Sequence, residues 1–133
     1  MVNKIGDYYT KESIDIIELK NIITSAAIIV LFATIYFNNN KKKEKLGAIP
    51  SLNKYESHNL NIGISISSVL IISASIYICF KEYFLDKKMG YKLTGNELRI
   101  IAFGISLIST FILLHVVTSN YDSDENLGTE PIV

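Results

Sequence analysis

The sequence has 133 residues, enough for one domain, and 49% of them are apolar, which is high for a small soluble fold. Thirteen basic and thirteen acidic residues cancel, so the net charge excludes a general electrostatic affinity for nucleic acid. The single cysteine, Cys79, excludes a disulfide within the chain. A membrane protein is therefore the first class to test.

Residues 1–20 mix charged and apolar side chains. In the stretch TKESIDIIELK, Ile14 and Ile17 lie at helical spacing with Asn21, and Thr10 is a candidate N-cap. This pattern predicts an amphipathic helical lead-in that lies near a membrane interface. Because the chain lacks a basic start followed by an apolar core, we expect no cleavable signal peptide.

Three uncharged segments follow at residues 21–37, 60–80 and 100–118, with lengths of 17, 21 and 19 residues. As a helix the first extends about 25 Å, and the other two match the roughly 20 residues that cross the hydrocarbon of a bilayer. A soluble protein with three buried core helices is the alternative, but it needs polar outer faces that these segments lack. We therefore predict an all-α membrane protein with a compact bundle of three transmembrane helices over residues 21–118.

The segments between the spans predict where the helices end. The run NNNKKKEK at 38–45 is interpreted as the end of the first helix, with its asparagines as caps, and as the start of a loop of about twenty residues. The second helix is expected to continue to Gly90, a natural C-cap, and TGNE at 94–97 has the form of a capping box for the third. The acidic tail, residues 119–133, has no apolar periodicity and is expected to be extended.

The distribution of Lys and Arg predicts the orientation in the membrane. There are three in residues 1–20, five in 38–59, five in 81–99 and none in 119–133. With three spans, the N-terminus and the second loop share one side, which then holds more basic residues than the other. Since the basic side is usually cytoplasmic, the N-terminus is predicted inside and the tail outside. A re-entrant second segment would instead place both basic loops on one side.

Small residues predict where the helices pack, because close backbone approach drives helix association in a bilayer. At about 100° per residue, the second span has two seams of small residues, and the first and third have one each. The predicted helix-packing residues are Thr24, Ala27 and Thr34 in the first span, Gly63, Ser67, Ala74, Ser68 and Ser75 in the second, and Ala102, Ser106 and Ser109 in the third. Serines that line an aqueous pore are the alternative to serines that bond to their own or a neighbouring helix.

Basic and aromatic residues flank the spans. A Lys or Arg beside a span gains about 1 kcal/mol from anionic lipid. The predicted membrane-interface residues are Lys20, Lys41, Lys42, Lys43, Lys45, Lys81, Lys87, Lys88 and Arg99, and the predicted aromatic belt is Tyr77, Phe80, Tyr83 and Phe84. Nucleic acid is the alternative partner for KKKEK, but one lysine cluster is a small basic surface, and anionic lipid is favoured.

Residues that could carry chemistry are few. No Asp, Glu, Lys or Arg lies inside a span, so proton relays, ion-coupled transport and voltage sensing are not expected of this chain alone. His115, near the end of the third span, is interpreted as a headgroup or partner contact. The sequence contains no catalytic pair, metal-ligand set or phosphate-binding glycine pattern. We therefore predict no enzymatic activity, no cofactor, no metal and no small-molecule substrate.

Three features together give the layout of a known class. They are the short tyrosine-bearing N-terminus, the span ELRIIAFGISLISTFILLHVV and the acidic tail. This layout resembles that of the small multi-span membrane proteins under the capsids of large DNA viruses. The resemblance implies a structural protein of a virion inner membrane that links the bilayer to overlying minor capsid proteins. It carries over no functional residue.

Two other functions fit the same layout. A holin-like pore former has a similar size, three spans and charged ends, although such proteins usually end in a basic tail and residues 119–133 contain no Lys or Arg. An accessory subunit of a respiratory or translocation complex would lie in a cellular inner or organellar membrane. The expected partners are a bilayer with anionic headgroups and other membrane or capsid proteins, contacted through the loops and tail.

Overall fold

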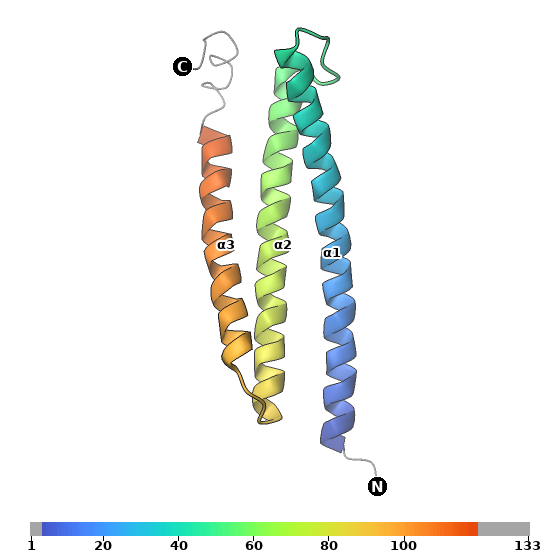
Figure 1. The fold of residues 1–133 in the computed structure, drawn as a ribbon, viewed down its shortest axis with the longest axis vertical. Helices are drawn as coiled ribbons and strands as arrows, with labels where there is room; N and C mark the ends of the chain where they lie inside the picture. The colour runs from blue at the N-terminus through green and yellow to red at the C-terminus, as the bar shows by residue number, and fades with distance from the viewer. Residues whose placement is uncertain (1–3, 120–133) are drawn as a thin grey trace. The chain divides into compact units, whose positions relative to one another are not determined.

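Within residues 4–119, the chain forms three long helices joined by short connections (Figure 1). The computed structural model describes residues 4–119, of which 89% are helical, and none of these residues lies in a strand. Helix α1 spans Lys4–Lys45, α2 spans Lys54–Lys88 and α3 spans Thr94–Ser119. The predicted all-α class with three long apolar helices is confirmed, while the predicted extended tail lies outside the described residues beyond Ser119.

Each helix is long and apolar enough to cross a membrane, judged by length and composition. The most apolar stretches have mean hydropathies of 1.9, 2.1 and 2.4 in chain order. Only 6%, 11% and 0% of the residues in these stretches are buried within the protein. Large apolar side chains therefore cover the outside of the helices, as Ile29, Phe32 and Leu70 show with exposures above 60%. Soluble proteins rarely leave such extensive apolar surface in water.

The end of α1 lies eight residues beyond the first apolar segment. The Gly47 N–H donates to the Glu44 carbonyl and the Ala48 N–H to the Lys43 carbonyl, at 3.2 and 2.9 Å, which is the bond pattern of a Schellman motif. Gly47 takes the left-handed conformation that this motif needs, with φ +74°. The run NNNKKKEK is therefore helical, and the prediction that its asparagines cap the helix was wrong. Nothing in the run breaks a helix, since Asn and Lys are both tolerated inside one.

The start of α2 is a capping box that the sequence analysis did not identify. The Glu56 N–H donates to Asn53 Oδ1 at 2.8 Å, and the Asn53 N–H donates to Glu56 Oε1 at 3.3 Å. This reciprocal pair satisfies two N–H groups that otherwise have no partner in the first turn. The helix then runs to Lys88 and ends in a second Schellman motif at Gly90, φ +77°, as predicted.

One predicted helix start was wrong, and a second was correct in position, since α3 begins at Thr94 but without the predicted capping box. Thr10 lies inside α1, where its hydroxyl donates to the Gly6 carbonyl at 3.0 Å, so it caps nothing. At α3 the first main-chain bond of the helix runs from the Glu97 N–H to the Leu93 carbonyl at 2.9 Å. Leu93 is therefore the N-cap residue, and Thr94 is already helical.

The first connection between helices is shorter than predicted, because it comprises residues 46–53 in place of a loop of about twenty residues. The second comprises residues 89–93, in agreement with the predicted helix end at Gly90 and helix start at residue 94. The helices thus extend well past the apolar segments: α1 alone has 42 residues, or about 63 Å at 1.5 Å per residue. About three fifths of that length lies outside the first apolar segment, which covers 17 of the 42 residues.

The chain forms two compact units. Among the described residues, unit 1 comprises those up to Ala27 together with Leu70–Ile108, and unit 2 comprises Ile28–Val69 together with those from Ser109 onward. In unit 1 the buried side chains Ile16, Ile78 and Leu85 form a small core between α1 and α2, with Tyr9, Leu19 and Ile23 packed against it. Ile14 and Ile17, the predicted apolar face of the lead-in, are about half exposed, and Ile16 is the residue that packs.

Unit 2 is held at the α1–α2 connection by a buried amide. Asn40 is 3% exposed, and its Oδ1 accepts a hydrogen bond from the Leu52 N–H at 2.9 Å. Lys43 Nζ also donates to Ser51 Oγ at 3.2 Å. These bonds fold the connection back onto the last turns of α1. The third asparagine of NNNKKKEK thus fixes the turn after the helix from a position inside the helix.

Candidate functional site: a polar network between the three helices

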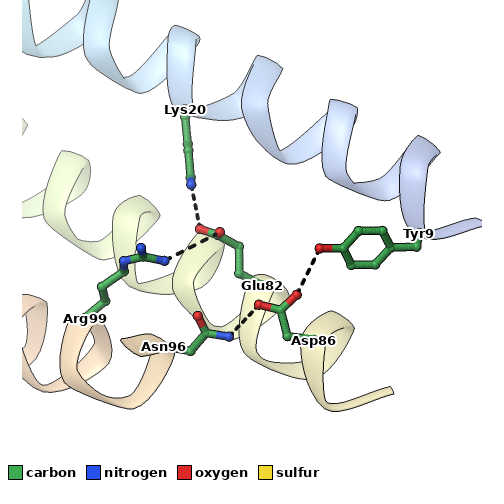
Figure 2. A network of polar contacts seen from close by, with 6 residues as sticks. All are labelled: Tyr9, Lys20, Glu82, Asp86, Asn96 and Arg99. Carbon is green, nitrogen blue, oxygen red and sulfur yellow. Dashed lines mark hydrogen bonds and ion pairs between the residues drawn. The ribbon is translucent and has the colours of Figure 1, made fainter. Parts of the chain in front are cut away.

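A network of polar contacts between the helices lies in unit 1. Figure 2 shows this interhelical network, which consists of Tyr9 and Lys20 of α1, Glu82 and Asp86 of α2, and Asn96 and Arg99 of α3. Glu82 and Asp86 are four residues apart on a helix, so their side chains lie on the same face. Both carboxylates therefore lie where α1 and α3 approach α2.

Glu82 accepts contacts from both neighbouring helices. Lys20 Nζ lies 2.8 Å from Glu82 Oε1, and Arg99 Nη1 lies 4.0 Å from Glu82 Oε2. The Glu82 side chain is 20% exposed, whereas those of Lys20 and Arg99 are 46% and 59% exposed. Ion pairs of this exposure contribute about 0.2–1 kcal/mol each in water. The ion pair with Lys20 is the shorter of the two and therefore contributes more to stability than the ion pair with Arg99.

Asp86 makes the matching pair of contacts one turn further along α2. Asn96 Nδ2 donates to Asp86 Oδ2 at 2.8 Å, and the Tyr9 hydroxyl donates to Asp86 Oδ1 at 3.4 Å. Asn96 is buried, 6% exposed, so its bond to a carboxylate is shielded from water. Tyr9 also stacks edge-on against Tyr91, with ring centroids 5.4 Å apart.

The protonation of Tyr9 fits its role as a donor. Burial is the largest cause that raises the pKa of Tyr9 above its ordinary value of 10.0. A hydrogen bond with Ser13 acts in the opposite direction, and the negative charge of Asp86 raises the pKa further. Tyr9 therefore keeps its proton at neutral pH and donates to Asp86.

The network lies at one end of all three apolar segments. Lys20 directly precedes the first, Glu82 comes two residues after the second, and Arg99 directly precedes the third. Sequence reasoning did not find the network, because it treated the basic members separately as headgroup contacts. The signal was present: in antiparallel helices these three segment ends meet, and they carry two cations and an anion.

The arrangement can hold the helices together. The two carboxylates and two cations of the network balance each other, and each carboxylate contacts both α1 and α3. Among residues 4–119 no group of three or more His, Cys, Asp or Glu side chains could hold a metal ion. His115 of α3 is exposed and lies 3.3 Å, through Nδ1, from the hydroxyl of Ser119.

The predicted membrane-interface residues fall into three groups in the structure. Lys20 and Arg99 belong to the interhelical network. Lys81 and Lys88 lie over the rings of Tyr77 and Tyr8, at 5.8 and 4.8 Å from the ring centroids, and Lys87 is exposed on the last turn of α2. Lys41, Lys42, Lys43 and Lys45 occupy the last turns of α1, where Lys41 pairs with Glu44 at 3.6 Å. Their contact with lipid stays a prediction.

The predicted helix-packing residues are only partly covered. Thr24, Gly63, Ala102 and Ser109 are exposed, and the partly buried ones are Ala27, Thr34, Ser67, Ser68, Ala74, Ser75 and Ser106. A Cβ added at Gly63 would meet nothing within 4 Å, so α2 is not closely approached there. In α3 the buried small polar residue is Thr110, next to the predicted Ser109. The seams stay a prediction.

The span serines and threonines bond mainly to their own helices. Ser68 and Ser75 donate to carbonyls four residues earlier, both at 2.9 Å, and Thr24, Thr34 and Ser106 do the same. Such bonds satisfy a hydroxyl without water. The hydroxyls therefore do not require an aqueous pore.

Comparison with known proteins gives no assignment. No family model matches the chain, and neither a curated protein nor a solved structure matches it.

Proposed function

We propose that the protein is a non-enzymatic integral membrane protein with three spans that serves as a structural or assembly component of a larger complex. The observation that carries this proposal is the distribution of its surface. The apolar stretches of all three helices are almost wholly uncovered, whereas the polar side chains at their ends are used to tie the helices together. A bilayer supplies the apolar surroundings that these stretches need.

The interhelical network suits a bundle in lipid. Helices in a bilayer gain little from hiding leucine or isoleucine against each other, so packing and polar contacts hold them together. Glu82 and Asp86 supply four such contacts at one end of the apolar segments. The network is also placed where water still reaches its outer members, which keeps the cost of burying charge low.

The proposed contacts with other proteins involve parts of the chain that extend beyond the apolar segments. The first seventeen residues of α1 and the last eight of α2 lie outside them, as do the connection at 46–53 and the acidic tail. We propose that the connection at 46–53 and the tail, which the predicted three-span topology places on the same face, contact overlying capsid proteins, and that the membrane is the inner membrane of a virion. The resemblance in sequence layout to small membrane proteins of large DNA viruses supports this choice.

Localisation in the native assembly tests the proposal. The protein should resist extraction from membranes by alkaline carbonate, and it should be present in purified particles at fixed stoichiometry with crosslinks to capsid proteins. Extraction by carbonate would refute membrane insertion. Copurification with oxidoreductase or ATP synthase subunits, and absence from particles, would support an accessory subunit instead. Dye release from liposomes that contain the purified protein would support a holin-like pore.

Cysteine labelling tests the number of spans. Cysteines introduced at Lys43 and Ser123, in a chain with Cys79→Ser, should be labelled by an impermeant reagent from the same face, opposite the N-terminus. Labelling from opposite faces would overturn the three-span topology.

A further inference from the structure

Unit 1 has an open groove between α1 and α2 that the interhelical network does not occupy. We call it the aromatic–lysine groove. It has a volume of about 570 Å³, and its walls include Tyr8 and Ile16 of α1 and Phe84, Lys81, Lys87 and Lys88 of α2. The rings are accessible, since Tyr8 is 46% and Phe84 61% exposed.

The groove changes in character along α2. Its aromatic end, at Tyr77 and Phe80, belongs to the second apolar segment, which ends at residue 80. Its basic end, at Lys87 and Lys88, lies about 16 Å further along the helix axis. One end therefore suits a hydrocarbon chain and the other suits an anion.

The charge at the groove is positive. Three lysines and one acid, Glu12, line it, so its net charge is +2. The lysine heads are held close to the aromatic wall: Lys88 Nζ lies 4.8 Å from the centroid of the Tyr8 ring, and Lys81 Nζ lies 5.8 Å from that of Tyr77. Cation–π contacts of this kind hold an ammonium group over a ring and leave its N–H groups available for hydrogen bonds.

We propose that the aromatic–lysine groove binds one anionic phospholipid. The phosphate lies between Lys87 and Lys88, and an acyl chain runs along Phe84 toward Tyr77. The proposal rests on the proposed insertion in a membrane, where a lipid meets the groove at the depth of its own headgroup. A second copy of this surface is a poor occupant, because it would bring lysines against lysines, and Glu12 disfavours a more acidic ligand.

Native mass spectrometry of the full-length protein tests this site. The protein is reconstituted in nanodiscs of phosphatidylcholine with a minor fraction of phosphatidylglycerol. The protein is then released from the nanodiscs in the mass spectrometer, and the lipids that stay bound to it are counted. Wild type should retain one phosphatidylglycerol in preference to phosphatidylcholine. The double variant Lys87→Gln/Lys88→Gln should lose this preference by about 5-fold per lysine, or roughly 25-fold in all.

Matched variants separate a site from general charge attraction. Lys11→Gln/Lys92→Gln removes the same charge from two exposed positions of unit 1 that do not line the groove, and it should leave the preference unchanged. Lys87→Arg/Lys88→Arg keeps the charge and should retain the lipid. Equal losses in the two glutamine variants, or full retention in Lys87→Gln/Lys88→Gln, would overturn the proposal. Failure of membrane insertion is distinguishable, because the protein would then not enter the nanodiscs at all.

Discussion

Removing the charge of Glu82 should loosen α1 and α3 from α2. The substitution Glu82→Gln keeps the shape and a hydrogen-bond acceptor but removes the charge that meets Lys20 at 2.8 Å and Arg99 at 4.0 Å. An exposed pair contributes about 0.2–1 kcal/mol. Since Glu82 is only 20% exposed, we expect the upper end for Lys20 and less for the longer contact. The free energy of unfolding should fall by about 1–1.5 kcal/mol, close to tenfold in the equilibrium constant.

A double-mutant cycle measures the contact with Lys20 alone. Unfolding of wild type, Lys20→Met, Glu82→Gln and the double variant is followed in detergent micelles, and the coupling energy should be about 0.5–1 kcal/mol and should shrink as salt is added. The control cycle replaces Glu82→Gln with Glu18→Gln. Glu18 is two residues from Lys20 on the same helix and does not face it, so this cycle should be additive. Additivity in both cycles would refute the conclusion that the ion pair between Lys20 and Glu82 stabilises the contact between α1 and α2.

Three further predictions concern single positions. Folding raises the pKa of Tyr9, so the unfolded state releases the tyrosine proton at a lower pH than the folded state does. The free energy of unfolding of wild type should therefore fall as the pH rises from the ordinary pKa of 10.0 toward the pKa of the folded state. Tyr9→Phe should remove this fall. Unfolding measured across this range checks it, and identical profiles would contradict it. Gly47→Ala should lower the free energy of unfolding by about 1 kcal/mol, because an alanine is strained at φ +74° even though its Cβ has room. Gly63→Ala, inside a helix, should be neutral or stabilising. Thermal unfolding of both variants checks this pair of predictions. Asn53→Ala should cost about 1 kcal/mol through the lost capping box, and loss of helicity in the first turn of α2 should appear in hydrogen exchange.

The three helices could be predicted from the sequence because each apolar segment is long and uninterrupted. Their ends were harder to predict for a physical reason. The hydropathy pattern marks where an apolar segment ends, whereas a helix ends where the backbone leaves the helical conformation. At NNNKKKEK these two boundaries differ by eight residues, since the apolar segment ends at Phe37 but α1 ends at Lys45, just before the positive φ of Gly47. At Gly90 the second helix ends as predicted, because a glycine that can adopt positive φ marks the end of a helix directly, whereas hydropathy does not.

The interhelical network could not be predicted from single residues, because its meaning depends on register. Lys20 and Arg99 each border an apolar segment, and a basic residue at that place has an ordinary explanation in lipid headgroups. Only the pairing of α2 with both neighbours shows that Glu82 lies between them. A comparison of the three segment ends that lie together in an antiparallel arrangement would have found one anion, Glu82, between two cations, and with it the interhelical network.

The interhelical network explains how apolar helices of this length keep their register. In the proposed bilayer, the isoleucine-rich sides of the helices have similar surroundings at every depth, so sliding one helix along another changes little in apolar contact. Sliding α1 by one turn, about 5.4 Å, would separate Lys20 from Glu82 and Tyr9 from Asp86 at the same time. Because both carboxylates also contact α3, the same two residues set the register of both neighbours. The position of Glu82 and Asp86, and not the sequence of the apolar faces, thus determines which levels of the three helices meet in unit 1.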